Sequence, residues 1–328
     1  MYFEGFHGAS DVAEMDVYLP RRGYTITPNP SADTGRFVGI SLSISEDYCS
    51  IPVSANASYT VCFAFKTLHW LHYTANEKFL DINNVAGTQI SLQLAGDGEI
   101  AIVTPEDTVK TTDLRGKDDT WTFVEFKCVI HDTLGSYTLK VNGKEYFNRT
   151  GIDTHDAGNV EITAFKFKWY RGGNKFMAFD DIYIGDDFLG DYRIDRIDPD
   201  GNGAVTDWTP LVGTNYEEVD DGNSVDDDTT YNAGGDGDQD LYTYSDLSAL
   251  GIIHAVQTNI VCRETDANDF NIEQLARIDT TIYDEPPHAI AGQTYEILAR
   301  VMEENPATSS AWTLDDINAA QFGFEGSV

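Results

Sequence analysis

Hydrophobic and polar residues alternate with a period of two along much of the first 188 residues. The clearest runs are Tyr59–Lys66, Gln89–Leu94 and Trp121–Ile130. Because successive side chains of a β-strand point to opposite faces, this alternation predicts strands with one apolar face. Asn142-Gly143 separates two further runs of this kind and is typical of the tight turn of a β-hairpin. No helix is needed to explain the pattern in this part of the chain.

Two later runs, Glu161–Trp169 and Phe179–Ile184, continue the same pattern. Many short strands with regular turns predict two antiparallel sheets packed face to face. We therefore expect a jelly-roll-like β-sandwich over residues 1–188.

The remaining residues begin with Asp191–Ile197, pass through an acidic, glycine-rich stretch from Asn215 to Asp240, and return to strand patterning at Ile252–Val261 and Tyr295–Val301. A second β-sandwich over residues 189–328 is the simplest interpretation. Thr313 followed by Asp316 has the spacing of a capping box, which predicts one short helix near the C-terminus. The expected fold class is all-β, with two jelly-roll-like β-sandwich domains in tandem and at most one short C-terminal helix.

Charge supports this division of the chain. Residues 1–188 contain 26 Asp+Glu and 16 Lys+Arg, and residues 189–328 contain 29 and 5, which together give the net charge of −34. The second part contains no lysine, a composition break that places the boundary near Phe188–Gly190. An acidic chain without basic clusters is not expected to bind nucleic acid. The sequence also lacks a run of eighteen apolar residues, so we expect no membrane insertion, and nothing after Met1 has the pattern of a signal peptide.

Motifs for catalysis are missing from the sequence. Glycoside hydrolysis requires two facing carboxylates, and the strand Trp121–Ile130 offers Glu125 alone. G-x-S-x-G and phosphate-binding glycine motifs are absent, and the four cysteines are far apart without metal-ligand spacing. We expect buried free thiols, no enzymatic activity and no required cofactor.

Calcium is the ion for which the sequence offers ligands. Asp198, Asp200 and Asn202 match the opening of an EF-hand loop, with oxygen ligands at alternate positions. The match ends at Thr209, where such a loop needs a glutamate. An Asp/Asn-rich β-turn that binds no metal is the alternative.

Glycan recognition is the second kind of site with candidates. Aromatic rings that stack on sugars usually lie exposed beside polar side chains. Four aromatic residues fall at expected strand ends or loops: Trp70, Tyr73, Trp169 and Tyr170. The alternative is that these rings belong to the core.

Ten carboxylates lie within Glu217–Asp240. Such density is compatible with a solvated loop, with binding of divalent cations, or with docking onto a basic patch of a neighbouring subunit.

The order of motifs in the first part resembles the concanavalin A-like, laminin-G-like jelly roll. The resemblance rests on Phe3–Phe6, Gly35–Gly39, Ile40–Ile44, Phe63–Phe65, Trp121–Phe126, Val141–Gly143 and Phe179–Ile184. It implies a lectin-type sandwich, a fold used for glycan binding, for catalysis and as a structural module. It also implies a structural calcium held by Glu4 with Asp180 or Asp181. An exposed pair of polar residues is the alternative for the two aspartates.

Residues 190–328 resemble C-terminal modules of tailed-bacteriophage structural proteins. The resemblance rests on Gly190–Ile194, Trp208–Pro210, Asp226–Asn232, Asn305–Thr308 and Phe322–Phe324. It implies a non-catalytic component of the virion, assembled in the host cytoplasm, either a tail fibre or appendage protein or a subunit that decorates the capsid. The implied partners are other virion subunits, including further copies of the chain, and a host cell-surface glycan. The alternative function is a glycan-binding module for receptor recognition, and a glycoside hydrolase is the least favoured.

Overall fold

The computed structural model describes residues 2–4, 18–26, 31–36, 40–44, 47–68, 70, 77–95, 98–169, 176–222, 225–248, 251–265, 270–290 and 292–328. The chain divides into two compact units, unit 1 (Met1–Asp195) and unit 2 (Arg196–Val328). The sequence placed the boundary between residues 188 and 189. The segment from 189 to 195 belongs to unit 1 because it packs against one of its sheets, as described below.

One sheet of unit 1 has eight strands in the order β13-β12-β11-β6-β15-β4-β3, with β1 paired to β15. We call it the eight-stranded sheet. Its strands are β1 (Tyr2–Glu4), β3 (Ser31–Thr34), β4 (Ile40–Ile44), β6 (Ser58–Thr67), β11 (Thr122–Val129), β12 (Gly135–Val141), β13 (Lys144–Ile152) and β15 (Met177–Gly185).

The other sheet of unit 1 has seven strands in the order β10-β9-β8-β7-β14-β5-β2, and we call it the seven-stranded sheet. Its strands are β2 (Thr25–Ile26), β5 (Asp47–Asn56), β7 (Glu77–Asn84), β8 (Gly87–Ala95), β9 (Glu99–Val103), β10 (Thr108–Lys110) and β14 (Ile162–Trp169).

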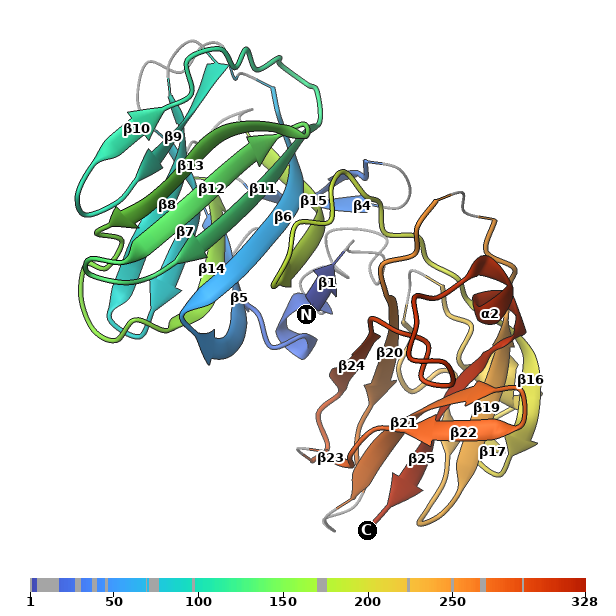
Figure 1. Cartoon of the computed structure of the whole chain (residues 1–328). Helices are drawn as coiled ribbons and strands as arrows, with labels where there is room; N and C mark the ends of the chain where they lie inside the picture. The colour runs from blue at the N-terminus through green and yellow to red at the C-terminus, as the bar shows by residue number, and fades with distance from the viewer. Residues whose placement is uncertain are drawn as a thin grey trace. The chain divides into compact units, whose positions relative to one another are not determined.

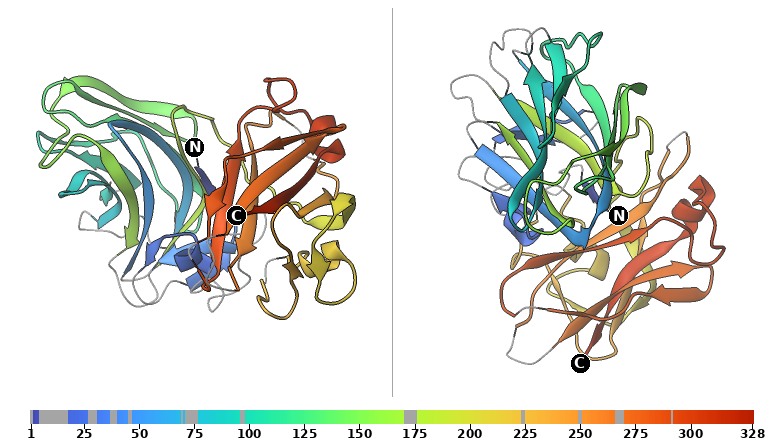
Figure 2. Two further views of the ribbon diagram at one scale, coloured as in Figure 1. Left: turned by 90° about the horizontal axis from the view of Figure 1, so that it is seen from below. Right: turned by 60° about the vertical axis from the view of Figure 1, so that its left-hand side comes forward.

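The two sheets of unit 1 form two layers (Figures 1 and 2). An aromatic core lies between them. Phe63 of the eight-stranded sheet meets Phe167 of the seven-stranded sheet with ring centroids 5.3 Å apart, and Phe179 lies 5.1 Å from Phe167. All the pairings between these strands are antiparallel, which confirms the expected β-sandwich. The hairpin of β12 and β13 turns at Asn142 and Gly143, both with positive φ, as its sequence predicted.

Unit 2 is also built almost entirely of antiparallel strands. Its largest sheet has the order β16-β19-β25-β21-β22, with β23 paired to β21, and β20 pairs with β24 in a separate ribbon. The strands are β16 (Pro199–Thr206), β17 (Thr209–Pro210), β18 (Asn232–Ala233), β19 (Gln239–Tyr244), β20 (Val256–Cys262), β21 (Asn271–Ile278), β22 (Thr281–Asp284), β23 (His288–Ala289), β24 (Glu296–Met302) and β25 (Gln321–Ser327).

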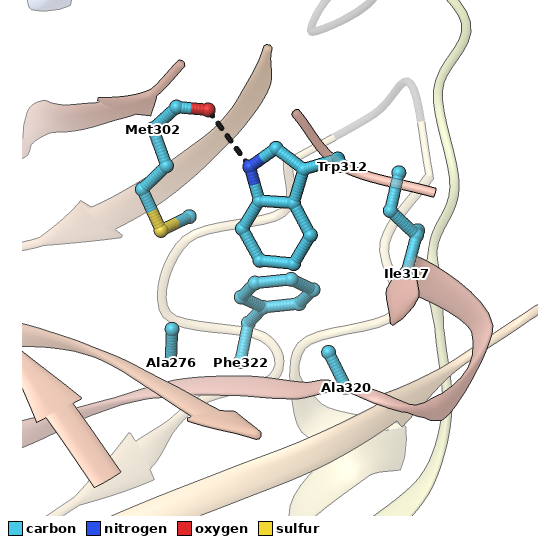
Figure 3. Close-up of a cluster of buried hydrophobic side chains, with 6 residues drawn as sticks. All are labelled: Ala276, Met302, Trp312, Ile317, Ala320 and Phe322. Carbon is cyan, nitrogen blue, oxygen red and sulfur yellow. Dashed lines mark hydrogen bonds between the residues drawn. The ribbon is translucent and has the colours of Figure 1, made fainter. Parts of the chain in front are cut away.

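The ribbon of β20 and β24 packs on the large sheet of unit 2, which gives the sandwich-like arrangement. Leu298 of the ribbon joins Tyr242 and Phe324 of the sheet in one buried cluster. A second cluster contains Trp312 and Phe322, and the Trp312 indole donates a hydrogen bond to the carbonyl oxygen of Met302 at 3.0 Å (Figure 3).

Helix α2 (Leu314–Ala319) confirms the expected short C-terminal helix. Thr313 is its N-cap, and its side chain accepts from the Asp316 N–H while Asp316 accepts from the Thr313 N–H. The expectation of at most one helix was too low. Residues 18–21 form a single helical turn and η3 (Asn215–Glu218) a 3-10 turn, and one turn is too short to show a helical period in the sequence.

All four cysteines are free thiols, of which Cys49, Cys62 and Cys128 are buried and Cys262 is half-buried. In the part of the chain that the structure describes, no helix has the length and hydropathy of a membrane span.

Candidate functional site

Charged and hydroxyl side chains gather on the outer face of the seven-stranded sheet, opposite the core. Strand pairing places Lys166 opposite Asp81, and Asp81 opposite Ser91. Cross-strand partners point to the same face of a sheet, so these side chains form a row across β14, β7 and β8. We call this surface the polar face, defined by Tyr48, Lys78, Asp81, Ser91, Gln93, Lys166 and Lys168.

Asp81 is the centre of the polar face. Its Oδ1 accepts a hydrogen bond from the Ser91 hydroxyl at 2.7 Å, and its Oδ2 forms an ion pair with the Lys168 ammonium group. Only 9% of the Lys168 side chain and 5% of the Asp81 side chain are exposed. Burial lowers the pKa of Lys168, Asp81 opposes this, and repulsion from Lys78 and Lys166 lowers it further. This charge pair is thus shielded from water although it lies on the outer face of the sheet and not in the sandwich core.

An aromatic ring borders this pair. The Tyr48 ring of β5 is half-buried, and the Lys166 ammonium group lies 4.0 Å from its centroid. Tyr48 pairs with Lys168 across the strands, so the ring and the two lysines share the face. A β-bulge between Lys78 and Leu80 brings Lys78 opposite Gln93 on the same side.

The outer face of the eight-stranded sheet is covered at its centre. Cys62, Ala64, Phe123 and Tyr183 form a buried cluster there, against which Leu189 and Tyr192 pack. Glu125, the carboxylate that the sequence offered for hydrolysis, lies on this face and accepts the Gly190 N–H at 3.0 Å. The segment after residue 188 therefore occupies this surface, and Glu125 is a structural acceptor.

Of the four aromatic residues proposed from sequence for sugar stacking, the structure describes two, and both belong to the core. Trp70 and Trp169 are completely buried, and the Trp70 ring lies 4.9 Å from the Phe65 ring in the core. Trp169 shares the core face of β14 with Phe165 and Phe167 because alternate residues of a strand point the same way. The sugar-stacking role suggested for these two indoles is therefore corrected, and the core alternative is confirmed for both. Tyr73 and Tyr170 lie outside the described residues.

Glu4, Asp180 and Asp181 come together near the N-terminal strand, as the jelly-roll resemblance implied. All three are buried, and Glu4 on β1 faces Ile182 on β15. A β-bulge between Asp180 and Tyr183, with Asp181 at φ 48°, breaks the alternation of β15. Both aspartates can therefore be buried, and the alternative of an exposed pair is wrong.

These carboxylates already have partners within the chain. Glu4 accepts from the hydroxyl groups of Tyr18 and Tyr24, at 3.1 and 3.0 Å. Asp180 accepts the N–H groups of Arg36 and Asp181, and the Arg36 guanidinium lies 3.5 Å from Asp181 Oδ2.

The pKa values of the two aspartates reflect this burial. The pKa of Asp180 is raised to about 8, first by burial and then by the Asp181 charge. The pKa of Asp181 is raised to about 6 by burial, against the lowering effects of the Ile194 N–H and Arg36. Within the described residues these groups do not converge as metal ligands, and Arg36 supplies the positive charge. The donor set does not fit a calcium ion.

The second calcium candidate lies along a strand. Asp198 pairs with Arg196, the Asp200 carboxylate accepts the Thr243 hydroxyl, and Asn202 Oδ1 accepts the Tyr216 N–H. In β16 alternate residues are about 6.6 Å apart, so these oxygens do not converge. Neither the EF-hand-like loop nor the β-turn alternative describes this segment. A Cβ at Gly203 would lie 2.5 Å from the Leu241 carbonyl oxygen, so this glycine serves strand packing.

The carboxylate-rich stretch is partly structural. Glu218 accepts the N–H groups of Val212 and Tyr231, both at 3.0 Å. Asp240 is fully buried, and burial raises its pKa, while bonds from Trp208, Asn215 and Tyr242 lower it. These contacts hold the loops of unit 2 together, so this part of the stretch is not a bare solvated loop.

The sequence analysis did not predict the polar face, although the alternation of residues in one strand indicates part of it. In Glu161–Trp169 the lysines alternate with Phe165, Phe167 and Trp169, which fixes the lysines on the outer face. Tyr48 likewise alternates with Cys49 and Ile51 of the core. The convergence of β5, β7, β8 and β14 requires the sheet order, which the sequence does not reveal.

Comparison with known proteins finds matches among solved structures alone. No family model matches the chain, and no curated protein matches it. Among solved structures, a "Sialidase" matches with 11% identity and a TM-score of 0.41, covering 56% of this chain and 18% of its own. "Cellulose induced protein, Cip1" matches with 14% identity and a TM-score of 0.40, covering 52% and 94%. "Alginate lyase Aly36B" matches with 10% identity and a TM-score of 0.39, covering 58% and 98%.

Proposed function

We propose that the chain is a non-catalytic glycan-binding protein and that unit 1 holds the glycan on the polar face. One observation carries the proposal: Lys168, Asp81 and Ser91 form a shielded, hydrogen-bonded cluster on the side of the sheet that faces away from the core. Removing charged groups from water costs free energy, and this pair does not contribute to the packing of the core. Binding of a polar ligand, which requires polar groups held in fixed positions, explains why this cluster is present.

The chemistry of this surface suits a sugar. Sugar hydroxyl groups are bound by donors and acceptors held in place, and the apolar side of a pyranose ring stacks on an aromatic face. The polar face offers the half-buried Tyr48 ring beside Lys166, with the buried Ser91 and Gln93 behind them in the same sheet. These groups favour recognition of a glycan over the purely structural role that the phage resemblance implied.

The absence of catalysis is part of the proposal. Hydrolysis of a glycosidic bond requires one carboxyl group to donate a proton and a second to act on the opposite side of the sugar. Both oxygens of Asp81 are taken, one by Ser91 and one by Lys168. Asp81 therefore serves as a fixed acceptor that positions Lys168.

A glycan array tests this proposal. The full chain is compared with Lys166→Ala and with Lys144→Ala, a matched control in which a lysine lies 4.5 Å from the Tyr146 ring on β13. We expect wild type and Lys144→Ala to bind the same glycans, and Lys166→Ala to lose most of the signal. An array without hits, or hits that Lys166→Ala retains in full, would contradict the proposal.

The resemblance of residues 190–328 to phage modules supports placing this glycan-binding chain on a tailed-phage particle, beside other virion subunits. Immuno-electron microscopy of purified particles tests the placement. Labelling at the head or the tail is expected, and particles that lack the chain would contradict it.

A further inference from the structure

Three of the ten lysines, Lys78, Lys166 and Lys168, lie together on the polar face of a chain that is strongly acidic overall. The whole chain has 21 Lys+Arg against 55 Asp+Glu. On this one face Lys78 and Lys166 lie close enough to Lys168 to repel its charge. The row through Lys78 and Gln93 continues over Ala101 to Lys110 at the edge of the sheet.

Few carboxylates oppose these lysines among the described residues of the face. Asp81 is already bonded to Ser91 and Lys168. Glu99, at the start of β9, lies 4.0 Å from Arg115. Among the described residues of the face, the lysines therefore outnumber Asp81 and Glu99.

The positive charges of these lysines repel one another where they are partly shielded from water. A negatively charged ligand would relieve this repulsion. Neutral sugars do not require this positive charge, because uncharged donors also bind hydroxyl groups. Lys166 and Lys168 flank Tyr48, so one sugar ring could stack on the aromatic ring while its anionic substituent meets the ammonium groups.

We propose that the glycan bound by the polar face is an anionic one, whose ring substituents, carboxylate or sulfate, contact Lys78, Lys166 and Lys168. This inference rests on the proposed function of the same face and names its ligand class. The long-range field of a chain with net charge −34 repels such a polymer, so selection depends on these close contacts.

Matched ligand pairs test the inference by calorimetry on the full chain. The first pair is an oligogalacturonate and its methyl ester, in which a small methyl group replaces the charge of each carboxylate. The second pair is dextran sulfate and dextran, which tests the sulfate source. We expect the charged member of one or both pairs to bind at least about tenfold more tightly than its neutral partner.

Three variants assign that preference to the polar face. Lys166→Gln should weaken binding of the charged ligand about tenfold, because a charge-assisted contact is lost. Lys166→Arg should retain most of the affinity, and Lys144→Gln should change nothing. A merely structural role of Lys166 would not produce a loss that depends on the charge of the ligand.

The outcomes separate this inference from the proposed function. If neutral glycans bind and neither the ligand charge nor Lys166→Gln changes the affinity, the ligand class is wrong while glycan binding stands. If no glycan binds, charged or neutral, the proposed function itself has failed. Preference for a charged ligand that Lys166→Gln leaves intact would also overturn the assignment to this face.

Discussion

Lys168 and Asp81 form a charge pair of which both members are shielded from water, on a face that the core does not use. Such a pair gains little free energy over apolar residues, whereas loss of one member leaves a buried charge without its partner. At the scale of the residue, replacing one member of the pair should therefore destabilise the fold, whereas replacing both members together should be tolerated.

Lys168→Met should lower the free energy of unfolding of unit 1 by about 3–5 kcal/mol, because it removes the cationic partner of the buried Asp81 carboxyl group and leaves that group bonded to Ser91. The double variant Asp81→Leu with Lys168→Met should recover most of that loss. Urea denaturation of the full chain measures both. Equal destabilisation by the single and the double variant would show that the pair does not behave as a buried ion pair.

Asp180 gives a pH dependence whose sign follows from its raised pKa. The folded chain holds this proton more tightly than the unfolded chain, since the pKa is about 8 against the ordinary 3.8. Its contribution to stability is complete below pH 3.8 and is lost as the pH rises towards 8, at up to about 1.4 kcal/mol per pH unit. Asp180→Asn should flatten the decline of the unfolding free energy with pH.

Asp187→Asn is the matched control for this experiment, because the Asp187 side chain is 85% exposed. It should leave the slope between pH 4 and pH 8 close to that of the wild type. A slope that Asp180→Asn does not change would mean that Asp180 is ionised throughout this range.

Individual residues were the hardest level to predict from sequence. Trp70 and Trp169 were named as sugar-stacking candidates because they fall at expected strand ends, but both indoles are buried in the core. For Trp169 the alternation with Phe167 already contained the answer, whereas for Trp70 nothing local distinguishes a core ring from an exposed one. Glu4, Asp180 and Asp181 do meet, but Arg36, which is distant in sequence, could not be anticipated as the partner of the two aspartates.

At the scale of elements, the segment after residue 188 acts as a cover for the eight-stranded sheet. The Tyr192 hydroxyl donates to the Asp181 carbonyl oxygen at 2.5 Å, and its ring packs edge-on against Phe123 at 5.4 Å. Beneath it lies Cys62, whose pKa is raised mainly by burial. This thiol is therefore a reporter for the cover, since it lies outside the sandwich core that holds Cys49 and Cys128.

Tyr192→Ala should open this cover and raise the alkylation rate of Cys62 at least about tenfold in the folded protein. Mass spectrometry of iodoacetamide-treated protein measures the rate at each cysteine. Cys49 and Cys128 are internal controls and should remain unreactive. Tyr192→Phe keeps the ring and should protect Cys62 nearly as well as the wild type, and a Cys62 thiol that stays inert in Tyr192→Ala would contradict the role of the segment.

Helix α2 provides a second test at this scale. Thr313→Ala removes the capping side chain and should lower the free energy of unfolding of unit 2 by about 1 kcal/mol. Thr313→Ser retains the hydroxyl and should cost much less. The fluorescence of Trp312, which is buried next to this helix, follows the transition. Equal losses for both variants would argue against the cap.

The elements themselves were largely predictable, since period-two runs identified strands such as β6, β8 and β11, and the capping box identified α2. The exceptions are local breaks of the period. The bulge at Asp180 and Asp181 turns two adjacent carboxylates into the protein, and strict alternation had predicted that one of them points outward. A bulge has no sequence signature here, because it depends on the strands that flank β15.

At the scale of the whole molecule, the two units differ in their charged side chains. Residues 189–328 contain no lysine, so every lysine of the chain belongs to unit 1. Lysine chemistry therefore reports on unit 1 alone and distinguishes the polar face from other surfaces of that unit. Lys127 and Lys144 lie on the eight-stranded sheet and serve as references.

Lysine footprinting in the presence of a bound glycan tests the central claim most directly. The full chain is acetylated briefly with and without saturating glycan, and the modification of each lysine is quantified by mass spectrometry. Binding to the polar face predicts that Lys78 and Lys166 are protected while Lys127 and Lys144 keep their reactivity. Protection of Lys127 or Lys144 instead, or saturation that protects no lysine of the polar face, would contradict it.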